Sequence, residues 1–403
     1  MTMAAGSTGQ PLRILILTGY YLPGYKAGGP VRTLGNLAGH LGGEFDLRVL
    51  TRDRDSLDAA SYQGVTPNTW TRVGQAQVFY LTPGPGVLGR ISRIIRSAPH
   101  DLLYLNSLFD PLFTVWPLLL RRLGRDGGAP ALIAPRGECA PPALDLNRWK
   151  KAPYRRLARL AGLYRDLTWQ ASSPREAAAI SRVMNPPPER ILVAPNLATP
   201  GAADAPAPPW PRRNGPLRVL YLARITPMKN LVFALGVLAR VRVPLEVTIH
   251  GPVDDPAYWR HCQGLLGQMP PQVRVHYAGP MPHDQVAATL ARHDLFFLPS
   301  RGESFGHVIL EALIAGTPVL IADTTPWRGL AHHGVGWDLP LGSEAAWISC
   351  IHAAAAQGEA DYARWRARVL AFARARIADP APVAATRRLL YQAAGRPAVT
   401  DDG

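Results

Sequence analysis

Several features are scarce in this sequence, and each scarcity excludes a class of protein. The 403 residues include only three cysteines, far apart and without the spacing of a zinc site or a disulfide framework. No apolar run reaches the 18 residues of a membrane span, since residues 108–120 are interrupted by an aspartate and two prolines. The first ten residues carry no positive charge, unlike a secretory signal. These absences predict a cytoplasmic protein of a reducing compartment.

Acidic residues are the scarcer charge. The chain has 44 Lys and Arg against 29 Asp and Glu, a net charge of +15. Residues 1–198 hold 24 basic and 13 acidic residues (+11), which leaves 20 and 16 (+4) for the remainder. A basic half suits nucleic acid, an anionic bilayer or a phosphorylated substrate. The sequence shows neither a nucleic-acid-binding module nor stacking aromatics among its basic residues, so we expect no nucleic-acid partner.

One segment concentrates this charge. Residues 147–165 carry seven positive and no negative side chains. Apolar residues recur there at helical spacing: Trp149, Tyr154, Leu157, Leu160, Ala161 and Tyr164. Two interpretations stay open. The segment is a basic amphipathic helix on an anionic membrane surface, or a solvated helix packed through one apolar stripe.

Short apolar runs alternate with helical patterns along the chain, which predicts an α/β fold with parallel, doubly wound sheets. The expected strands are 12–18, 45–51, 77–81, 102–105, 131–134, 191–194, 218–222, 245–250, 273–277, 295–299 and 318–322. The expected helices include 31–41, 87–98, 147–165, 172–185, 231–240, 283–291, 306–315, 360–377 and 382–393, with a long polar loop over 53–70. A Pro-rich stretch divides the chain into these parts: an N-terminal domain 11–198, a linker 199–216, a C-terminal domain 217–377, and a closing helix and tail 378–403 that packs back on the first domain.

The stretch 296–323 reads as strand, loop, helix and strand. Gly316 stops the helix, and the helix begins at the carboxyl end of a strand, where ligands bind in open α/β sheets. Glu303 precedes this helix and Glu311 lies within it.

Two other loops of the same half also follow strands. They contain Arg224 with Lys229, and Gly251 with Pro252. Cations beside helix N-terminal amides suit a diphosphate, and carboxylates accept hydrogen bonds from sugar hydroxyls, so this edge of the sheet predicts a nucleotide-sugar site. Each group alone has an ordinary explanation, such as a solvated pair or a helix cap.

In the first half, Gly28 and Gly29 follow the first strand and open a helix. Glycines there let the backbone approach an anion, although an ordinary turn explains them equally well.

Longer motifs add a resemblance. The segments PSRGESFGHVILEALIAGTPVL, RITPMKN and SPREAAAI, with the glycine-rich first loop, resemble retaining glycosyltransferases of family 4, which have an E-x7-E motif and the GT-B fold. The segments PGYKAGGPVRTLGN, TRDRDS, PRGECAPPAL and DTTPW are similar to a subgroup associated with bacterial surface-polysaccharide assembly.

The resemblance implies roles for particular residues. It implies a catalytic set of Glu303 beside the donor sugar and Arg224 and Lys229 on the diphosphate. It implies a donor-binding set made of Gly28, Gly29, Gly251, Met281, Phe305, Gly306, His307, Val308 and Glu311, in which Glu311 holds the ribose. It places the acceptor near Asn106 and Arg136. Many family members carry histidine near the position of Asn106, so Asn106 receives no catalytic role.

The resemblance also implies transfer with retention from a nucleotide-diphosphate sugar, with no other cofactor and no divalent metal. The expected acceptor is lipid-linked or a polysaccharide, in exopolysaccharide, O-antigen or capsule synthesis at the inner face of a bacterial membrane. A non-catalytic nucleotide-sugar-binding protein on the same fold is the alternative.

Overall fold

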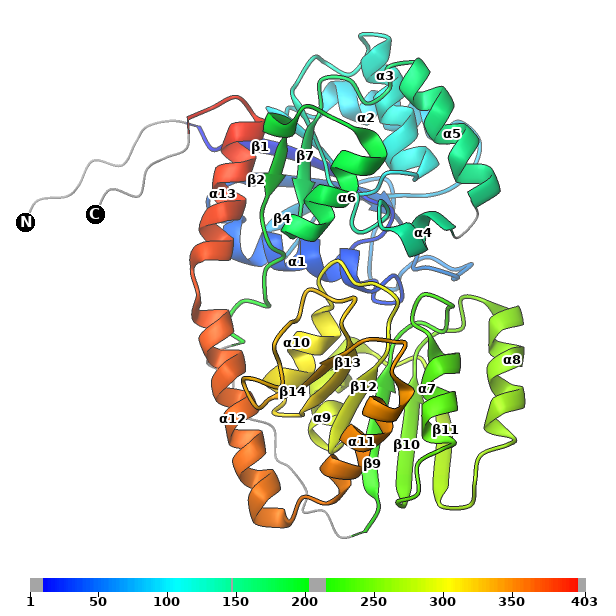
Figure 1. The fold of residues 1–403 in the computed structure, drawn as a ribbon. Helices are drawn as coiled ribbons and strands as arrows, with labels where there is room; N and C mark the ends of the chain where they lie inside the picture. The colour runs from blue at the N-terminus through cyan, green and yellow to red at the C-terminus, as the bar shows by residue number, and fades with distance from the viewer. Residues whose placement is uncertain (1–9, 146–147, 203–214, 398–403) are drawn as a thin grey trace, which may run out of the picture.

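The computed structural model describes residues 10–145, 148–202 and 215–397. Two sheets form the centres of a first and a second unit, which lie one above the other in Figure 1. Helices cover the sheets, so the predicted fold class, two doubly wound α/β domains, is confirmed. The predicted linker 199–216 falls mostly on 203–214, outside the described residues.

The first sheet has eight strands in the order β3-β4-β2-β1-β5-β6-β7-β8. Its strands are β1 (Arg13–Leu17), β2 (Asp46–Arg52), β3 (Trp70–Val73), β4 (Ala76–Leu81), β5 (Leu102–Leu105), β6 (Ala131–Ile133), β7 (Thr168–Ala171) and β8 (Ile191–Val193). Its helices are α1 (Gly29–Leu41), α2 (Val87–Ser97), the π-helical turn η1 (Pro111–Val115), α3 (Trp116–Arg122), α4 (Pro141–Asp145), α5 (Arg148–Leu160), α6 (Pro174–Met184) and the 3-10 turn η2 (Pro188–Arg190).

Alternation along β1 shows why both faces of this sheet are covered. Ile14 and Ile16 pack in one core with α1, whereas Leu15 and Leu17 pack in another core with α2. Successive side chains of a strand point to opposite faces, so an uninterrupted apolar strand needs a helix layer on each side.

The predicted parallel order is wrong at one edge of the first sheet. β3 runs antiparallel to β4, and Trp70 lies opposite Phe79, with ring centroids 5.4 Å apart. A short turn through Gly74, in the left-handed conformation, joins the two strands as a hairpin. The polar loop predicted over 53–70 therefore ends in an edge strand.

The second sheet has six parallel strands in the order β11-β10-β9-β12-β13-β14. Its strands are β9 (Leu217–Leu222), β10 (Leu245–His250), β11 (Val273–Gly279), β12 (Leu295–Leu298), β13 (Val319–Ala322) and β14 (Gly336–Leu339). Its helices are α7 (Leu231–Leu238), α8 (Pro256–Leu266), the 3-10 turn η3 (His283–Gln285), α9 (Val286–Ala291), α10 (His307–Ile314) and α11 (Glu344–Ala355).

Helix α10 ends as predicted. Gly316 is left-handed, with φ of +74°, and its N–H donates to Leu313 O at 3.0 Å. The next amide, Thr317 N, donates to Ala312 O at 2.8 Å. This pair of bonds is the Schellman motif, which satisfies the last carbonyls of the helix and turns the chain into β13.

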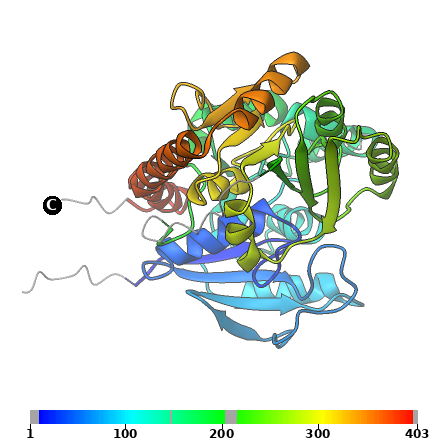
Figure 2. The ribbon, with the colours of Figure 1, turned by 90° about the horizontal axis from the view of Figure 1, so that it is seen from below.

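Two closing helices connect the units a second time. α12 (Glu359–Ala378) packs on α10 of the second unit, and α13 (Ala381–Ala393) runs along the first unit (Figures 1 and 2). Leu389 and Leu390 are buried in the core with α1, and Arg387 Nε lies 2.8 Å from Glu44 Oε2. The C-terminal helix therefore completes a core that begins at the N-terminus.

None of the helices in the described part of the chain is both long enough and apolar enough to cross a membrane.

Candidate functional site

The loop that leads into α10 is held by backbone geometry and aromatic packing. Gly306 has φ of +80°, and a Cβ there would lie 2.7 Å from Ile309 Cδ1, so this turn requires glycine. Trp327 donates its Nε1–H to Phe305 O at 2.6 Å, and the two rings pack with centroids 5.7 Å apart. These contacts fix the direction in which α10 leaves the loop.

Lys229 and Glu303, which were predicted to share a site, contact each other directly. Lys229 Nζ lies 2.5 Å from Glu303 Oε1, and the side chains are 18% and 10% exposed. Their loops are tied together, because Arg301 N donates to Met228 O at 2.8 Å. The structure thus places one cation and one carboxylate at the carboxyl ends of β9 and β12, neutralising each other.

Arg224 lies on the same loop but contacts a different carboxylate. Its Nη1 is 2.7 Å from Asp254 Oδ2, and the arginine side chain is 42% exposed. Gly251 has φ of +148°, and a Cβ there would lie 1.8 Å from Ala223 O, so the loops after β9 and β10 meet only because of this glycine. Met281, predicted on the donor side, is buried in the core of the second unit.

Helix α1 of the first unit faces the start of α10. Gly28 is its N-cap, with φ of 73°, and a Cβ on Gly29 would lie 3.9 Å from His307 Cδ2. Thr33 Oγ1 and His307 Nε2 are hydrogen-bonded at 2.9 Å. Two helix N-termini, one from each unit, therefore converge, and helix N-termini attract anions.

Glu311 is bound to a residue that the sequence analysis did not identify. Arg32 Nη2 of α1 lies 2.6 Å from Glu311 Oε1, and the side chains are 16% and 19% exposed. Burial raises the pKa of Glu311, and the Arg32 charge opposes that rise. Within the described residues, the buried Nε of Arg32 has no hydrogen-bond partner.

The histidines beside this pair are neutral at pH 7. Burial lowers the pKa of His307 to about 3, and the charges of Arg32 and Arg136 act in the same direction. Burial also lowers the pKa of His283, to about 4. Positive charge at this point therefore comes from arginine and not from histidine, and a guanidinium suits a phosphate.

Arg136 and Asn106, predicted on the acceptor side, belong to one buried network. Arg136 donates to Asn106 Oδ1 through Nη2 at 2.6 Å, to Asn196 Oδ1 at 3.0 Å and to Tyr104 Oη at 2.7 Å. Its backbone is left-handed, with φ of 53°. Asn106 is only 4% exposed, and its amide oxygen holds the guanidinium in place.

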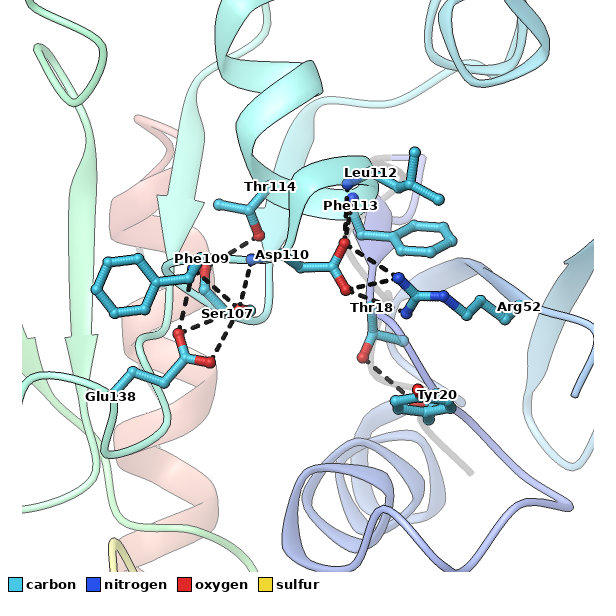
Figure 3. A network of polar contacts seen from close by, with 10 residues as sticks. All are labelled: Thr18, Tyr20, Arg52, Ser107, Phe109, Asp110, Leu112, Phe113, Thr114 and Glu138. Atoms are coloured by element: carbon cyan, nitrogen blue, oxygen red, sulfur yellow. Dashed lines mark hydrogen bonds and ion pairs between the residues drawn. The ribbon is translucent and has the colours of Figure 1, made fainter. Parts of the chain in front are cut away.

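A second polar network lies at the same edge of the first sheet (Figure 3). Glu138 accepts hydrogen bonds from Leu108 N at 2.5 Å and Ser107 Oγ at 3.1 Å, and burial raises its pKa. Asp110 caps η1 and pairs with Arg52 Nη2 at 3.0 Å. The end of β2 and the loops after β5 and β6 are thereby fixed to one another.

Glu176 joins the two units through a serine. It accepts from Gly137 N at 2.6 Å and from Ser172 N at 2.8 Å. Ser172 Oγ in turn reaches Ser304 O of the second unit at 2.9 Å. The loops at the interface between the two units thus contact each other as well as their own sheets.

Several of these residues carried a signal in the sequence. Arg32 lies one turn after the predicted Gly28–Gly29 turn, and Glu176 lies in the quoted SPREAAAI segment. Asn196 and Tyr104 carried none, because a single asparagine or tyrosine at a strand end has no motif. Among the residues that the structure describes, no three His, Cys, Asp or Glu side chains gather as metal ligands would.

Comparison with known proteins fits this geometry. Residues 207–357 match the family model of the glycosyl transferases group 1. The second unit therefore carries a group 1 glycosyltransferase domain. The chain is 31% identical over 144 residues to a D-inositol 3-phosphate glycosyltransferase of Jonesia denitrificans, covering 34% of each. It is 32% identical over 116 residues to a glycogen synthase of Mycobacterium tuberculosis, covering 28% of this chain and 27% of the other. The aligned part spans about a third of the length of these curated relatives.

Solved structures show the fold of the whole chain. Anabaena HepE, solved in complex with UDP and glucose, matches with a TM-score of 0.67 at 18% identity, covering 95% of this chain and 100% of HepE. WaaG, a glycosyltransferase involved in lipopolysaccharide biosynthesis, matches with a TM-score of 0.67 at 16% identity, covering 94% and 99%. The group 1 domain is thus one half of a GT-B fold.

Proposed function

We propose that this protein is a retaining glycosyltransferase that transfers a sugar from a nucleotide-diphosphate sugar to a lipid-linked or polysaccharide acceptor. The observation that carries the proposal is the pairing of Lys229 with Glu303 at 2.5 Å, at the edge of the second sheet that faces α1. That edge presents basic side chains, carboxylates and the N-terminus of α10 to one ligand. A nucleotide sugar suits this set, because its phosphates would contact the basic side chains and the helix N-terminus, and its hydroxyls would contact the carboxylates.

The roles follow from charge. Lys229 and Arg224 would bind the diphosphate and neutralise the leaving nucleotide as the glycosidic bond breaks, which is the electrostatic kind of stabilisation that dominates many enzymes. Glu303 would accept hydrogen bonds from the donor sugar and Glu311 from the ribose. The backbone from Phe305 to Val308, with Gly28 and Gly29 opposite, would enclose the phosphates.

The acceptor would enter from the first unit, beside Arg136. We assign no general base: the leaving phosphate would take the acceptor proton on the face where the new bond forms, which gives retention. The reaction would belong to exopolysaccharide, O-antigen or capsule synthesis at the inner face of a membrane. A lipid-linked acceptor would be found there, and the basic first half of the chain suits an anionic membrane surface. The named activity of WaaG, in lipopolysaccharide biosynthesis, supports this class of acceptor.

Two variants at the central pair test the proposal. Lys229→Ala and Glu303→Gln should each lower the turnover number for transfer by at least about a hundredfold, the usual cost of losing one transition-state contact. The matched control is the exposed ion pair between Arg240 and Glu344 on the same unit, whose variants Arg240→Ala and Glu344→Gln should keep full turnover. Wild-type turnover in Lys229→Ala would refute the site assignment.

The donor is found first, by thermal shift with a panel of nucleotide sugars. A donor at about 100 times its Kd should stabilise the fold by about 2.7 kcal/mol. The anomeric configuration of the product, read by NMR, then tests retention. Donor binding without transfer to any acceptor, and without slow donor hydrolysis, would favour the alternative, a non-catalytic nucleotide-sugar-binding protein.

A further inference from the structure

Helices α2, α3 and α5 form one outer layer of the first unit, at the upper right of Figure 1. Trp116 of α3 donates its Nε1–H to Leu88 O of α2 at 3.1 Å. Arg122 of α3 donates its Nε–H to Ala161 O, directly after α5, at 3.1 Å. The three helices therefore present one continuous surface, which we call the α2–α3–α5 face.

This face is strongly basic. α2 carries three Lys or Arg residues, α3 two and α5 six, eleven in all, and none of the three helices contains Asp or Glu. Those that are exposed on the face are Arg93, Arg96, Arg122, Arg148, Lys150, Arg156 and Arg159. The positive charge predicted for 147–165 is thus continuous with that of two neighbouring helices.

The same face is also apolar. The described chain exposes nine large apolar side chains, and six of them lie here: Leu88, Leu119, Leu123, Trp149, Leu157 and Leu160. Trp149, Leu157 and Leu160 are 73%, 66% and 77% exposed, and their spacing puts them on one side of α5.

The opposite side of α5 packs on the core. Ala158 is buried there, and Tyr154 Oη bonds to Tyr164 Oη at 2.8 Å. The single apolar stripe expected from the sequence is therefore two stripes. The interpretation of α5 as a solvated helix packed through its apolar residues accounts for the inner stripe and leaves the outer one unexplained.

We propose that the α2–α3–α5 face binds an anionic phospholipid bilayer, with Trp149, Leu157 and Leu160 inserted between headgroups and the surrounding arginines and lysines on lipid phosphates. Charge complementarity favours this occupant, since the three helices carry eleven basic residues and no acidic one. Tryptophan and leucine beside basic residues suit the boundary between headgroups and acyl chains. A nucleic-acid backbone would meet the charges and leave the leucines without contacts.

This proposal rests on the proposed function and extends it, because binding to the bilayer would bring the enzyme to a lipid-linked acceptor. Vesicle binding needs neither donor nor turnover, so the two proposals fail separately. Loss of donor stabilisation with vesicle binding intact would count against the proposed function alone.

The test is co-sedimentation of the full chain with vesicles of phosphatidylcholine, alone or mixed with phosphatidylglycerol. We expect binding to the mixed vesicles only, falling as salt rises. The triple variant Trp149→Ser, Leu157→Ser, Leu160→Ser should lower the partition coefficient by more than about tenfold. The triple variant Arg93→Gln, Lys150→Gln, Arg156→Gln should lower the partition coefficient by about fivefold for each charge removed.

Two control variants match these changes elsewhere on the surface. Leu57→Ser, Trp70→Ser, Val193→Ser removes three other exposed apolar side chains, and Arg260→Gln, Arg274→Gln, Arg292→Gln removes three exposed charges from the second unit. Both should bind vesicles as the unchanged chain does, and circular dichroism verifies the fold of all four. Absence of binding to anionic vesicles, equal losses in the controls, or binding to duplex DNA in place of vesicles would overturn the proposal.

Discussion

The two sheet edges that meet at the interface between the units hold their charged groups in different ways. On the first unit, Arg136 has three side-chain partners and Glu138 has backbone and hydroxyl donors, all from that unit. On the second unit, Lys229 and Arg224 each have one carboxylate partner. One edge is saturated with hydrogen bonds, whereas the other carries single ion pairs that a ligand can replace.

The difference shows that the two edges are suited to different tasks. Saturated networks keep a side chain in one position because every alternative leaves a buried polar group unsatisfied. The ion pairs of Lys229 and Arg224 each hold the cation through one carboxylate, so another anion can take the place of that carboxylate. The first edge is thus a fixed wall, and we expect the second edge and the interface between units to respond to a bound ligand.

The largest expected effect comes from breaking the fixed wall. Arg136→Ala leaves the amide oxygens of Asn106 and Asn196 buried without their donor, which should cost about 3 kcal/mol of the free energy of unfolding. Urea denaturation measures that loss, and Arg190→Ala, at an exposed ion pair with Asp166, is the control with a loss under about 0.5 kcal/mol. Equal losses in the two variants would show that the network is not rigid.

The next effect is a pH dependence at the interface. The pKa of His307 is lowered to about 3, so below about pH 6.5 the unfolded chain binds a proton that the folded chain does not. Stability is therefore lost as pH falls, by about 1 kcal/mol between pH 7 and 5.5 from this residue. His307→Gln keeps a partner for Thr33 and should remove that part of the slope. An unchanged slope in the variant would assign the dependence to His283.

The smallest expected effect on stability comes from the ion pair between the units. Arg32→Gln removes the partner of Glu311, yet the units can separate and let water reach the carboxylate, so we expect a loss under about 1 kcal/mol. Small-angle scattering should instead show a larger radius of gyration without ligand. The double variant Arg32→Gln, Glu311→Gln should return toward the compact value. If Arg32→Gln instead lost several kcal/mol of the free energy of unfolding with no change in the radius of gyration, the ion pair would be a fixed structural contact like the Arg136 network.

Local patterns predicted much of the architecture. The short apolar runs predicted most strands of the two sheets, and the glycines that flank α10 predicted where that helix begins and ends. α8 was missed, although Asp255 caps it and Pro256 opens it, because its apolar residues follow no strong period. β7 was missed because it is four residues long and contains Gln170, whose side chain is buried against Tyr104.

The site was predictable where both partners lie on one sheet edge. Lys229 and Glu303 each follow a strand of the same parallel sheet, and parallel topology brings such residues together. Arg32 and Glu311 belong to different units, so their contact depends on how two bodies dock, which no local pattern specifies. The same reason explains why the bond from Ser172 to Ser304 was not foreseen.

Helix α13 sets the order in which this protein is completed during synthesis. It supplies Leu389, Leu390 and Ala393 to the core of the first unit, yet it is translated after the entire second unit. Until it leaves the ribosome, the first unit lacks these contacts, including the packing of the Tyr391 ring on Phe45. The half of the protein that is made first is therefore the half that finishes folding last.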